Sequence, residues 1–512
     1  MRELDRRRFL ERSAVGAAAL TLPLGEALAG ASEPVAEAAI SKRALRALRN
    51  SVRGPVLTPG QRGYGNARLV YNERYDGRRP QAVIEPLNPR DVQAVVRWAN
   101  RFGVRIVAKS GGHSYAGYST LSNGVVVDLT RIRGVRTRAN NTRATVGAGA
   151  QLLDVYAALS KRGVTVPAGS CPSVGVGGHA LGGGMGLAGR NFGLLSDNIV
   201  ALTIVTADGR IRRVDRNDDE DLYWACRGGG GGNFGIVTGF MFRTHRARSA
   251  SWFNIGWPWA AASEALETWQ RVVPHASRKL TAIFHLVTGS GGEPVVSTDG
   301  QFFGSVGEMR RAIAPLLEHD AQLADGHSAY LPLMKRWAGC LDFSLKACHT
   351  EGTRRGGKLP RAAFYAKSDY VDEDLPSAAR ERMKRWIERR NADPALGSGA
   401  LLLDSYGGRL NQPKPGATAF VHRDELFCIQ YGAYFDGGQA QRASRGWINQ
   451  TRNAMQPFVS GQAYQNYIDP GLKGWQRAYY GSNLRRLRQV KRQYDPDFLF
   501  RFPQAIPPAG GG

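Results

Sequence analysis

Residues 108–119, AKSGGHSYAGYS, are the stretch that decides the fold. A strand-like run, VRIVAK (104–109), ends at Lys109 and opens into a loop that holds Gly111, Gly112 and His113. Adjacent glycines let the backbone approach a ligand closely, and their consecutive amides form a concavity suited to anions. His113 is the strong nucleophile of this loop. A surface turn that happens to contain a histidine explains this stretch equally well on its own.

A second glycine-rich block follows at 167–198, PAGSCPSVGVGGHALGGGMGLAGRNFGLLSDN. Such a density of glycine indicates a backbone that wraps around a ligand. Residues 184–189 and 230–235 each match the dinucleotide-binding pattern GxGxxG, and Asp208 follows the first match. That fingerprint requires a strand directly before it and a helix that opens within it. Here glycines precede the first match, and Asp208 lies in an ADG turn that is typical of a β-hairpin. We therefore do not expect a nicotinamide-binding Rossmann domain.

The rest of the chain predicts an alternation of short strands and helices. Residues 82–85 are a predicted strand, and a helix follows with Asp91 in its first turn and an apolar face of Val92, Val95, Val96 and Ala99. Residues 42–53 and 152–163 also read as helices. In the region 246–455 glycine is sparser, and apolar strand-like runs alternate with amphipathic helices such as 376–391. Near the end, Leu484, Leu487, Val490 and Tyr494 stripe one face of a helix, and its basic residues, Lys491 among them, are expected to be solvated.

Bulk composition limits the classes of function. With 512 residues, two domains are expected. The net charge of +26 raises the question of nucleic acid, but the basic residues are scattered among acids and no nucleic-acid-binding motif appears. We expect no nucleic-acid partner. A basic surface that attracts anionic substrates or cell-envelope polymers is the simpler explanation. We also expect no metal site, and the sequence leaves the oligomeric state open.

The amino terminus resembles an export signal. Residues 5–12, DRRRFLER, resemble a twin-arginine signal, a short apolar run follows, and Ala27–Ala29 supplies an A-x-A cleavage candidate. The run is too short to span a bilayer. Residues 1–29 are thus a candidate signal peptide, and we expect a periplasmic or extracellular protein without stable membrane association. Removing them leaves a charge of +25.

Five cysteines do not make a disulfide framework in a chain of this length. Cys340 and Cys348 are close enough in sequence to close a small loop, but the sequence does not decide whether they pair. The other three are Cys171, Cys226 and Cys428.

Three blocks in this order resemble the FAD-binding domain of the vanillyl-alcohol-oxidase/p-cresol-methylhydroxylase (PCMH) superfamily: GGHSYAGYS (111–119), GSCPSVGVGGHALGGGMG (169–186) and WACRGGGGGNFGIVT (224–238). The tail, with NYID, YYGSN, RLRQVKRQYDP and PQAIP, is similar to the berberine-bridge-enzyme-like branch. The resemblance implies an α+β fold with a two-subdomain PCMH-type FAD-binding domain at 60–245. It further implies a substrate domain at 246–455 with an antiparallel sheet flanked by helices, and a segment at 456–507 that returns to the FAD domain.

Carried over motif by motif, the resemblance implies a flavin bonded covalently to His113 and to Cys171. A small valine at 174, where the family has its oxygen gate, favours an oxidase. Ala180 and Met185 stand where relatives often carry larger side chains. The implied cofactor-binding residues beyond the two attachment points are Lys109, Ser110, Gly111, Gly112, Ser114, Gly117, Tyr118, Gly169, Ser173, Val174, Gly175, Gly177, Gly178, Gly182, Gly183, Asn191, Gly193, Asp197, Gly235, Val237, Tyr480 and Asn483.

The resemblance also implies the catalytic base. In relatives that oxidise sugars it is a tyrosine that matches Tyr467, and the candidates for coupling to it are Tyr406, Asp404 and the pyrimidine edge of the flavin. A free phenol has a pKa near 10, so neighbours would have to lower it for work near neutral pH. A tyrosine packed as an amphipathic side chain is the alternative without the family match.

Together these features predict a secreted, bicovalently flavinylated oxidase. It would turn an alcohol or hemiacetal of a sugar, glycoside or natural product into a carbonyl compound and reduce O₂ to H₂O₂. Two alternatives remain: a flavin oxidase that acts on a C–N or C–C bond, and a flavin-binding protein without turnover. The region 246–455 carries no pattern that names the substrate.

Overall fold

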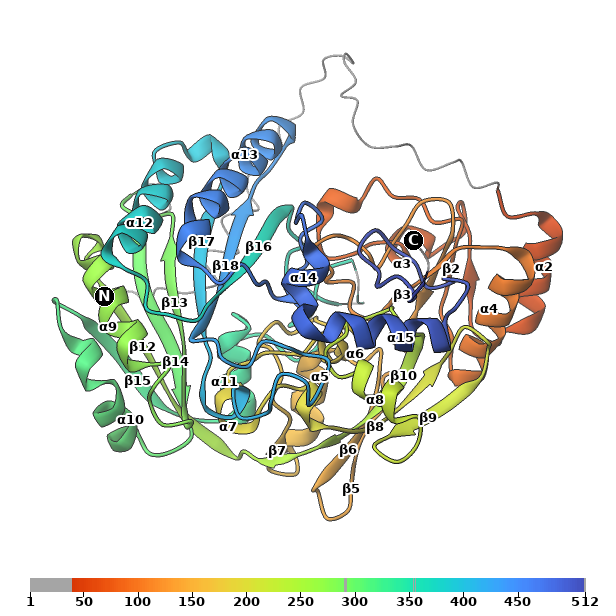
Figure 1. The fold of residues 1–512 in the computed structure, drawn as a ribbon, viewed down its shortest axis with the longest axis horizontal. Coiled ribbons are helices and arrows are strands. Elements are labelled where there is room, and N and C mark those ends of the chain that lie inside the picture. The colour runs from red at the N-terminus through yellow and green to blue at the C-terminus, as the bar shows by residue number, and fades with distance from the viewer. Residues whose placement is uncertain (1–38, 290–291, 353, 355, 511–512) are drawn as a thin grey trace.

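The computed structural model describes residues 39–289, 292–352, 354 and 356–510. Its first sheet has four strands in the order β1 (Val56–Leu57), β2 (Ala82–Ile84), β4 (Val125–Asp128) and β3 (Ile106–Lys109). The strands β2, β4 and β3 are parallel. Helix α4 (Pro89–Phe102) begins at an Asn88 cap and buries the predicted apolar face, while α2 (Lys42–Ser51) packs against it (Figure 1). This sheet begins at Val56, just before the expected boundary at residue 60.

The second sheet is antiparallel. Its order is β5 (Val135–Arg138), β6 (Arg143–Gly147), β10 (Ile236–Arg243), β8 (Ile199–Val205) and β9 (Ile211–Asp215). The pairing of β8 with β9 confirms the hairpin around the ADG turn. The segment 184–189 follows helix α6 (Val176–Leu181) rather than a strand, so its GxGxxG match lacks the Rossmann context. The remaining small elements here are α3 (Tyr64–Ala67), α5 (Leu152–Ser160), α7 (Gly189–Phe192), α8 (Glu220–Ala225) and the strand pair β7 (Val164–Thr165) and β11 (His245–Arg246).

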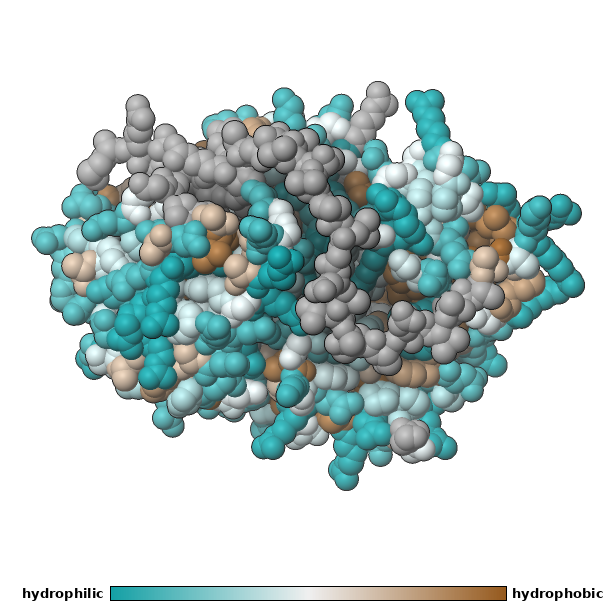
Figure 2. Space-filling view, turned by 90° about the horizontal axis from the view of Figure 1, so that it is seen from above, coloured by the Kyte–Doolittle hydropathy of each residue, from teal (hydrophilic) through white to brown (hydrophobic). Residues whose placement is uncertain are grey.

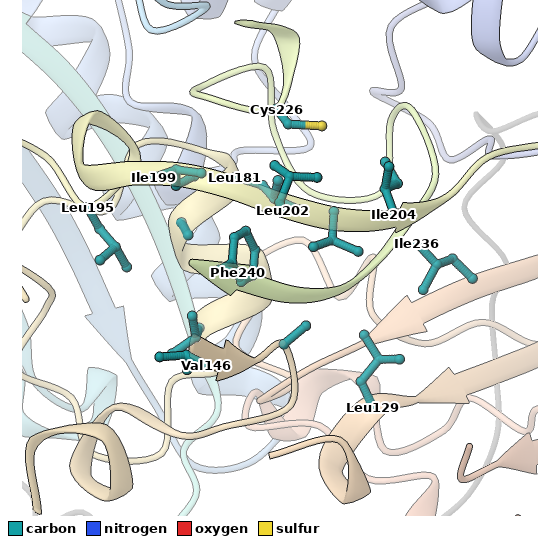
Figure 3. Close-up of a cluster of buried hydrophobic side chains, with 14 of the residues drawn as sticks. Leu129, Val146, Leu181, Leu195, Ile199, Leu202, Ile204, Cys226, Ile236 and Phe240 are labelled. Atoms are coloured by element: carbon teal, nitrogen blue, oxygen red, sulfur yellow. The ribbon is translucent and has the colours of Figure 1, made fainter. Parts of the chain in front are cut away.

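One apolar core joins these elements. Side chains of the second sheet such as Val146, Leu202 and Phe240 meet Leu181 of α6 and Leu129, which directly follows β4 (Figure 3). All five are buried. The first glycine-rich loop follows β3, and the second leads into α6. Because these elements are joined by the shared core, the core fixes the two loops with respect to each other.

The third sheet has seven antiparallel strands. Their order is β15 (Gln322–Ala329), β12 (Ser249–Trp257), β14 (Val295–Phe302), β13 (Leu280–Val287), β17 (Gly399–Ser405), β18 (Phe427–Tyr434) and β16 (Phe364–Val371). One face packs into a second core with helices α9 (Ala262–Val272), α10 (Val306–Ile313), α12 (Ser377–Asn391) and α13 (Gly438–Met455). Helix α11 (Tyr330–Trp337) instead packs on α5 of the first half. The predicted α+β architecture, with an antiparallel sheet flanked by helices, is thus present (Figure 1).

The tail returns to the first half of the chain. Helices α14 (Trp475–Tyr480) and α15 (Leu484–Tyr494) lie across it, and Leu487, Val490 and Tyr494 are buried as predicted (Figure 1). The expectation of a solvated basic face is wrong for Lys491. Its ammonium group is fully buried, pairs with Asp495 at 2.6 Å and donates to the backbone oxygens of Asn233 and Phe500. The lysine thereby ties the tail to the glycine loop at 228–235.

Cys340 and Cys348 form a disulfide, with their Cα atoms 5.7 Å apart. The candidate signal peptide at 1–29 lies outside the described residues. Within the described residues, no helix combines the length and apolar character that a membrane crossing needs. Figure 2 shows a largely hydrophilic face on which apolar residues gather in small separate patches.

Candidate active site

A cavity of about 410 Å³ lies where the two halves of the chain meet. Its walls come from the loop after β3, the loop that carries Cys171, the glycine loop at 228–235, the exposed face of the seven-stranded sheet, and the tail. Of the predicted cofactor-binding residues, those that line the cavity are Ser110, Gly111, Gly112, His113, Ser114, Tyr118, Gly169, Cys171, Ser173, Val174, Gly175, Gly177, Gly178, Gly235 and Val237.

The two glycine-rich loops meet backbone to backbone. A Cβ added to Gly111 would lie 2.2 Å from the amide nitrogen of Gly175, and one added to Gly175 would lie 2.0 Å from the hydroxyl of Ser110. Side chains at either position would push the loops apart. These glycines are therefore needed for loop contact, and the contact sets the width of the cavity.

Other glycines leave open space that faces the cavity. A Cβ added to Gly178 would meet no atom within 4 Å, and one added to Gly231 would come no closer than 3.4 Å to another backbone atom. Gly178 is also exposed. A smooth backbone wall of this kind suits the close approach of a phosphate-bearing group. At the same end, the rings of Tyr118 and Phe502 lie 5.1 Å apart. The walls thus fit a nucleotide with a diphosphate.

His113 and Cys171 lie at the other end. The imidazole stacks on Tyr71 with ring centroids 4.2 Å apart, and its Nε2 lies 2.9 Å from the hydroxyl of Ser173. Burial, and then the nearby His179, lower the pKa of His113 to about 3. The ring is therefore neutral at physiological pH, which is the nucleophilic form. The thiol of Cys171 is exposed toward the same cavity.

Tyr467 and Asp404 form a hydrogen-bonded pair on the wall formed by the tail and β17. The Tyr467 hydroxyl donates to the Asp404 carboxylate over 2.9 Å. Burial first, and then the charge of Asp404, raise the pKa of Tyr467 well above its ordinary value. The expectation that its neighbours lower this pKa is therefore wrong for the protein alone, because a carboxylate that accepts a hydrogen bond stabilises the protonated phenol.

Two residues absent from the predicted site complete this wall. The ring of Tyr115 stacks on that of Tyr467 with centroids 5.5 Å apart, and the amide of Gln430 donates to the Tyr115 hydroxyl over 2.6 Å. Both line the cavity. Gln430 stands among apolar residues in the strand β18. A polar residue at one position of a period-two pattern is the signal that could have identified it.

Tyr406 does not reach the cavity. It is fully buried behind the wall, and its hydroxyl pairs with that of Tyr370 at 2.9 Å. The coupling to Tyr467 through a direct hydrogen bond is therefore absent among the described contacts. Tyr406 belongs to a buried cluster with Phe420 and Tyr464, against which the ring of Tyr467 packs.

Several predicted cofactor-binding residues do not line the cavity and instead stabilise the structure around it. Lys109 is buried in an ion pair with Asp128 at 2.9 Å. The tail residues Gln465 and Asn466 occupy the space that a side chain at position 182 would need. Gly117 packs on Tyr75, Gly183 on Phe420, and Tyr480 and Asn483 donate to backbone oxygens. The residues outside the cavity lining are Lys109, Gly117, Gly182, Gly183, Asn191, Gly193, Asp197, Tyr480 and Asn483.

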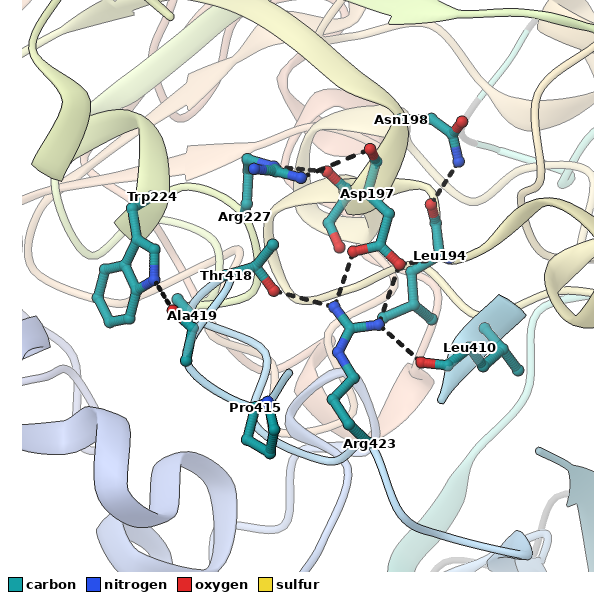
Figure 4. Close-up of polar contacts among 12 residues, drawn as sticks. Leu194, Asp197, Asn198, Trp224, Arg227, Leu410, Pro415, Thr418, Ala419 and Arg423 are labelled. Atoms are coloured by element: carbon teal, nitrogen blue, oxygen red, sulfur yellow. Dashed lines mark hydrogen bonds and ion pairs between the residues drawn. The ribbon is translucent and has the colours of Figure 1, made fainter. Parts of the chain in front are cut away.

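Asp197 has a clear structural partner. Its carboxylate accepts two hydrogen bonds from the buried guanidinium of Arg423, at 2.7 and 3.0 Å, and one from the amide of Leu194 (Figure 4). The same guanidinium also donates to Thr418 and to the backbone of Leu410. This ion pair joins the turn beside Gly193 to the loop between β17 and β18, and it gives the acid at position 197 a structural role.

Comparisons with known proteins agree with this geometry. Residues 80–215 match the model of the FAD binding domain, and residues 463–507 match that of the berberine and berberine-like segment. An uncharacterized FAD-linked oxidoreductase of Bacillus subtilis, YvdP, is 32% identical over 460 residues, which cover 89% of this chain and 98% of the relative. A xylooligosaccharide oxidase of Thermothelomyces thermophilus is 31% identical over 519 residues, with 96% and 99% covered.

Solved structures show the same likeness. The berberine-bridge-enzyme-like protein 1 of Physcomitrella patens superposes with a TM-score of 0.83 at 31% identity, covering 91% of this chain and 99% of that one. A xylooligosaccharide oxidase from Myceliophthora thermophila, solved with xylobiose, gives a TM-score of 0.81 at 28% identity and covers 91% and 100%. The chain therefore belongs to the berberine-bridge-enzyme-like family of FAD-linked oxidoreductases within the PCMH superfamily.

Proposed function

We propose that this protein is a bicovalently flavinylated oxidase that converts an alcohol or hemiacetal into a carbonyl compound. One observation carries the proposal. A single cavity brings two nucleophiles, His113 and Cys171, to one end, where they face a hydrogen-bonded Tyr467–Asp404 pair. A flavin that merely binds needs neither nucleophile, and a structural protein does not need a buried acid–base pair.

His113 and Cys171 would hold the flavin ring, and the glycine wall with Gly178 would hold its diphosphate. Each attachment replaces one ring-system C–H bond and one N–H or S–H bond by a C–N or C–S bond. Two protons and two electrons leave for each bond formed, and O₂ accepts them as H₂O₂. A neutral imidazole at His113 and a thiolate at the exposed Cys171 are the nucleophiles that this chemistry needs.

Tyr467 would take the proton of the substrate hydroxyl. Because its own hydroxyl already donates to Asp404, the tyrosine can accept a proton from the substrate as it passes its own to the carboxylate. The raised pKa of Tyr467 is then no obstacle, since no free phenolate has to form. The chemistry that a bound flavin would supply is acceptance of the hydride from the substrate carbon and transfer of the electrons to O₂. Val174 lines the cavity, and a small side chain at this position would favour reaction with O₂.

The substrate we propose is a neutral, hydroxylated molecule. Tyr71, Tyr115, Phe364 and Tyr434 give the cavity an aromatic wall, and Gln430 and Asp404 give it polar groups. Relatives named for oxidation of xylooligosaccharide and chitooligosaccharide support a sugar. A relative named for monolignol oxidation supports a phenolic alcohol as the second candidate. A base that is a tyrosine paired with a carboxylate favours oxidation of a hydroxyl over that of a C–N or C–C bond.

We also propose that the protein is exported in its folded, flavin-loaded form. The support is the arginine-rich start of the sequence, residues 5–12, with its apolar run and A-x-A sequence. Export after folding suits a chain that must acquire a cofactor first. Replacing Arg6, Arg7 and Arg8 by lysine should leave the enzyme, flavin included, inside the cell. Secretion that is unaffected by this change would overturn the proposal.

Tyr467→Phe tests the catalytic proposal. The variant should keep its flavin and lose turnover by roughly two to four orders of magnitude, the usual contribution of a general base. The assay is bleaching of flavin absorbance after rapid anaerobic mixing with sugars and aromatic alcohols. Tyr370→Phe, at a buried tyrosine outside the cavity lining, is the matched control. Bleaching at the native rate in Tyr467→Phe would contradict the assignment.

A further inference from the structure

Three side chains from three segments are linked by hydrogen bonds on one wall of the cavity. Thr350 donates from its hydroxyl to that of Ser173 over 2.6 Å, and the Ser173 hydroxyl lies 2.9 Å from Nε2 of His113. Ser173 and Thr350 are 3% and 2% exposed. Thr350 belongs to the substrate half of the chain, whereas Ser173 and His113 belong to the two glycine-rich loops. The line therefore connects both halves to the ring nitrogen of the proposed attachment residue.

The direction of these bonds decides the state of the imidazole. A hydroxyl has one hydrogen to donate. Because Ser173 accepts from Thr350, its own hydrogen is available for Nε2 of His113, which accepts it in the tautomer that carries its hydrogen on Nδ1. In that tautomer Nε2 is occupied, and Nδ1 is the nitrogen left for attachment. A neutral imidazole with a carbon substituent on Nδ1 has its lone pair on Nε2, so this arrangement matches the attached state of the ring.

The backbone around Thr350 is held in place by several contacts. It pairs with Leu359 in a bridge, and the amide of Leu359 bonds to the carbonyl of His349. Two residues before Thr350, Cys348 closes the disulfide with Cys340. That disulfide packs on Leu153 of α5 in the first half of the chain. Next to Thr350, His349 also faces Asp154 of α5 at 3.3 Å.

We propose that Ser173 and Thr350 are positioning residues that hold Nε2 of His113 as an acceptor and so present Nδ1 for flavin attachment. This inference rests on the proposed function, because it concerns attachment through His113. Through Thr350, the substrate half of the chain would then help to form the bond between His113 and the flavin. Attachment at Cys171 does not depend on this line.

The experiment compares Thr350→Val, Ser173→Ala and Thr350→Ser by peptide mass spectrometry of the purified holoproteins. The flavin-bearing peptides of His113 and of Cys171 are quantified separately. Loss of one ordinary hydrogen bond should lower the His113-linked fraction by about three- to tenfold in the first two variants. The Cys171-linked fraction should remain, and Thr350→Ser, which keeps the hydroxyl, should match the native protein.

The outcomes separate the inference from the function on which it rests. A native protein without flavin on His113 would remove the covalent proposal itself. Native-level His113 attachment in both Thr350→Val and Ser173→Ala would overturn the positioning role while leaving the function intact. Equal loss in Thr350→Ser would also overturn it, because the hydroxyl is present there. Equal loss of both linkages in Thr350→Val would show a general packing effect and likewise count against it.

Discussion

At the scale of single residues, the Tyr467–Asp404 pair combines two demands. In the proposed mechanism the phenol must be near the substrate, and the proton that it takes must have a destination. Asp404 can be that destination, since it is 7% exposed and lies 2.9 Å from the Tyr467 hydroxyl. A buried carboxylate beside a phenol disfavours free phenolate. The proposed mechanism therefore has Tyr467 pass its proton to Asp404 as it takes the proton of the substrate.

Asp404→Asn should therefore lower kcat by roughly two orders of magnitude or more, with a small effect on KM. An amide accepts the hydrogen bond but cannot take the proton. Steady-state oxygen consumption checks this expectation, with flavin content as the control for folding. If kcat were unchanged, the carboxylate would not be the destination of the proton.

Asp197 illustrates a different kind of residue. The sequence suggested a cofactor contact, but the carboxylate is held by Arg423 (Figure 4). Asp197→Asn leaves a buried guanidinium without its counter-charge, which should destabilise the protein by about 3 kcal/mol. Denaturant unfolding measures this change. The flavin content of the protein that remains folded should stay native, and a selective loss of flavin with unchanged stability would restore the cofactor role.

At the scale of elements, the segment between β17 and β18 makes a pH-dependent contribution to the stability of the fold. Glu425 is 2% exposed, and burial, then the charges of Asp372 and Asp424, raise its pKa to about 8. The folded protein therefore binds a proton that the unfolded chain releases above about pH 4.5. Stability from this group is full at acid pH and is lost as the pH rises through about 8.

Glu425→Gln should remove this part of the pH dependence. The native protein should lose stability between pH 5 and 8, roughly the interval between the two pKa values, and the variant should lose less. Thermal unfolding across that range checks the sign. Parallel curves for the two proteins would mean that Glu425 is already ionised in the folded state.

The disulfide segment 340–348 is a second element with a measurable contribution. Closing a loop of this size should stabilise the fold by about 2–3 kcal/mol through the unfolded chain. The double variant Cys340→Ser/Cys348→Ser should show this loss in denaturant unfolding. Native protein with reductant is the matched control. An unchanged midpoint in both would mean that the segment is held by packing on α5 alone.

The sequence predicts elements well where a local pattern decides them. The apolar face of α4 and the hairpin β8–β9 follow from periodicity and turn residues, and the structure confirms both. Prediction from the sequence fails where distant segments meet. Lys491 reads as a surface lysine in the sequence, but in the fold it donates to the backbone oxygens of Asn233 and Phe500. Gln430 lies at the cavity wall, where it donates to Tyr115, which lies in another domain. The family resemblance supplied most of the site, but not these long-range partners.

At the scale of the whole molecule, the seven-stranded sheet is asymmetric. Helices cover one face, and the other faces the flavin half of the chain. On that open face, the ladders align Asp404 with Ile283, Asp299 and Asn254 in successive strands. With strands about 4.8 Å apart, Asn254 lies roughly 14 Å from the Asp404 carboxylate. Of this row, Ile283 and Asp404 line the cavity, while Asp299 pairs with His285 at 2.5 Å. Under the proposed function, a substrate of several sugar units would extend along this row toward Asn254.

Asn254→Ala should therefore raise KM for an oligosaccharide by several-fold, on the order of one lost hydrogen bond, with little change for a monosaccharide. Asp325→Asn, whose carboxylate pairs with Arg310 near the sheet edge, is the control. Steady-state kinetics over a series of chain lengths makes the comparison. Equal KM values at every length would show that the row is outside the substrate path.

The central claim is that the two halves of the chain close on a flavin bonded at both His113 and Cys171. The most direct measurement is the intact mass of the acid-denatured holoprotein, followed by peptide mapping. We predict retained flavin, a mass increase of one FAD less two hydrogens for each bond, and flavin on both peptides. Flavin released by acid would contradict covalent attachment, and a single link would contradict the role of the residue left unmodified.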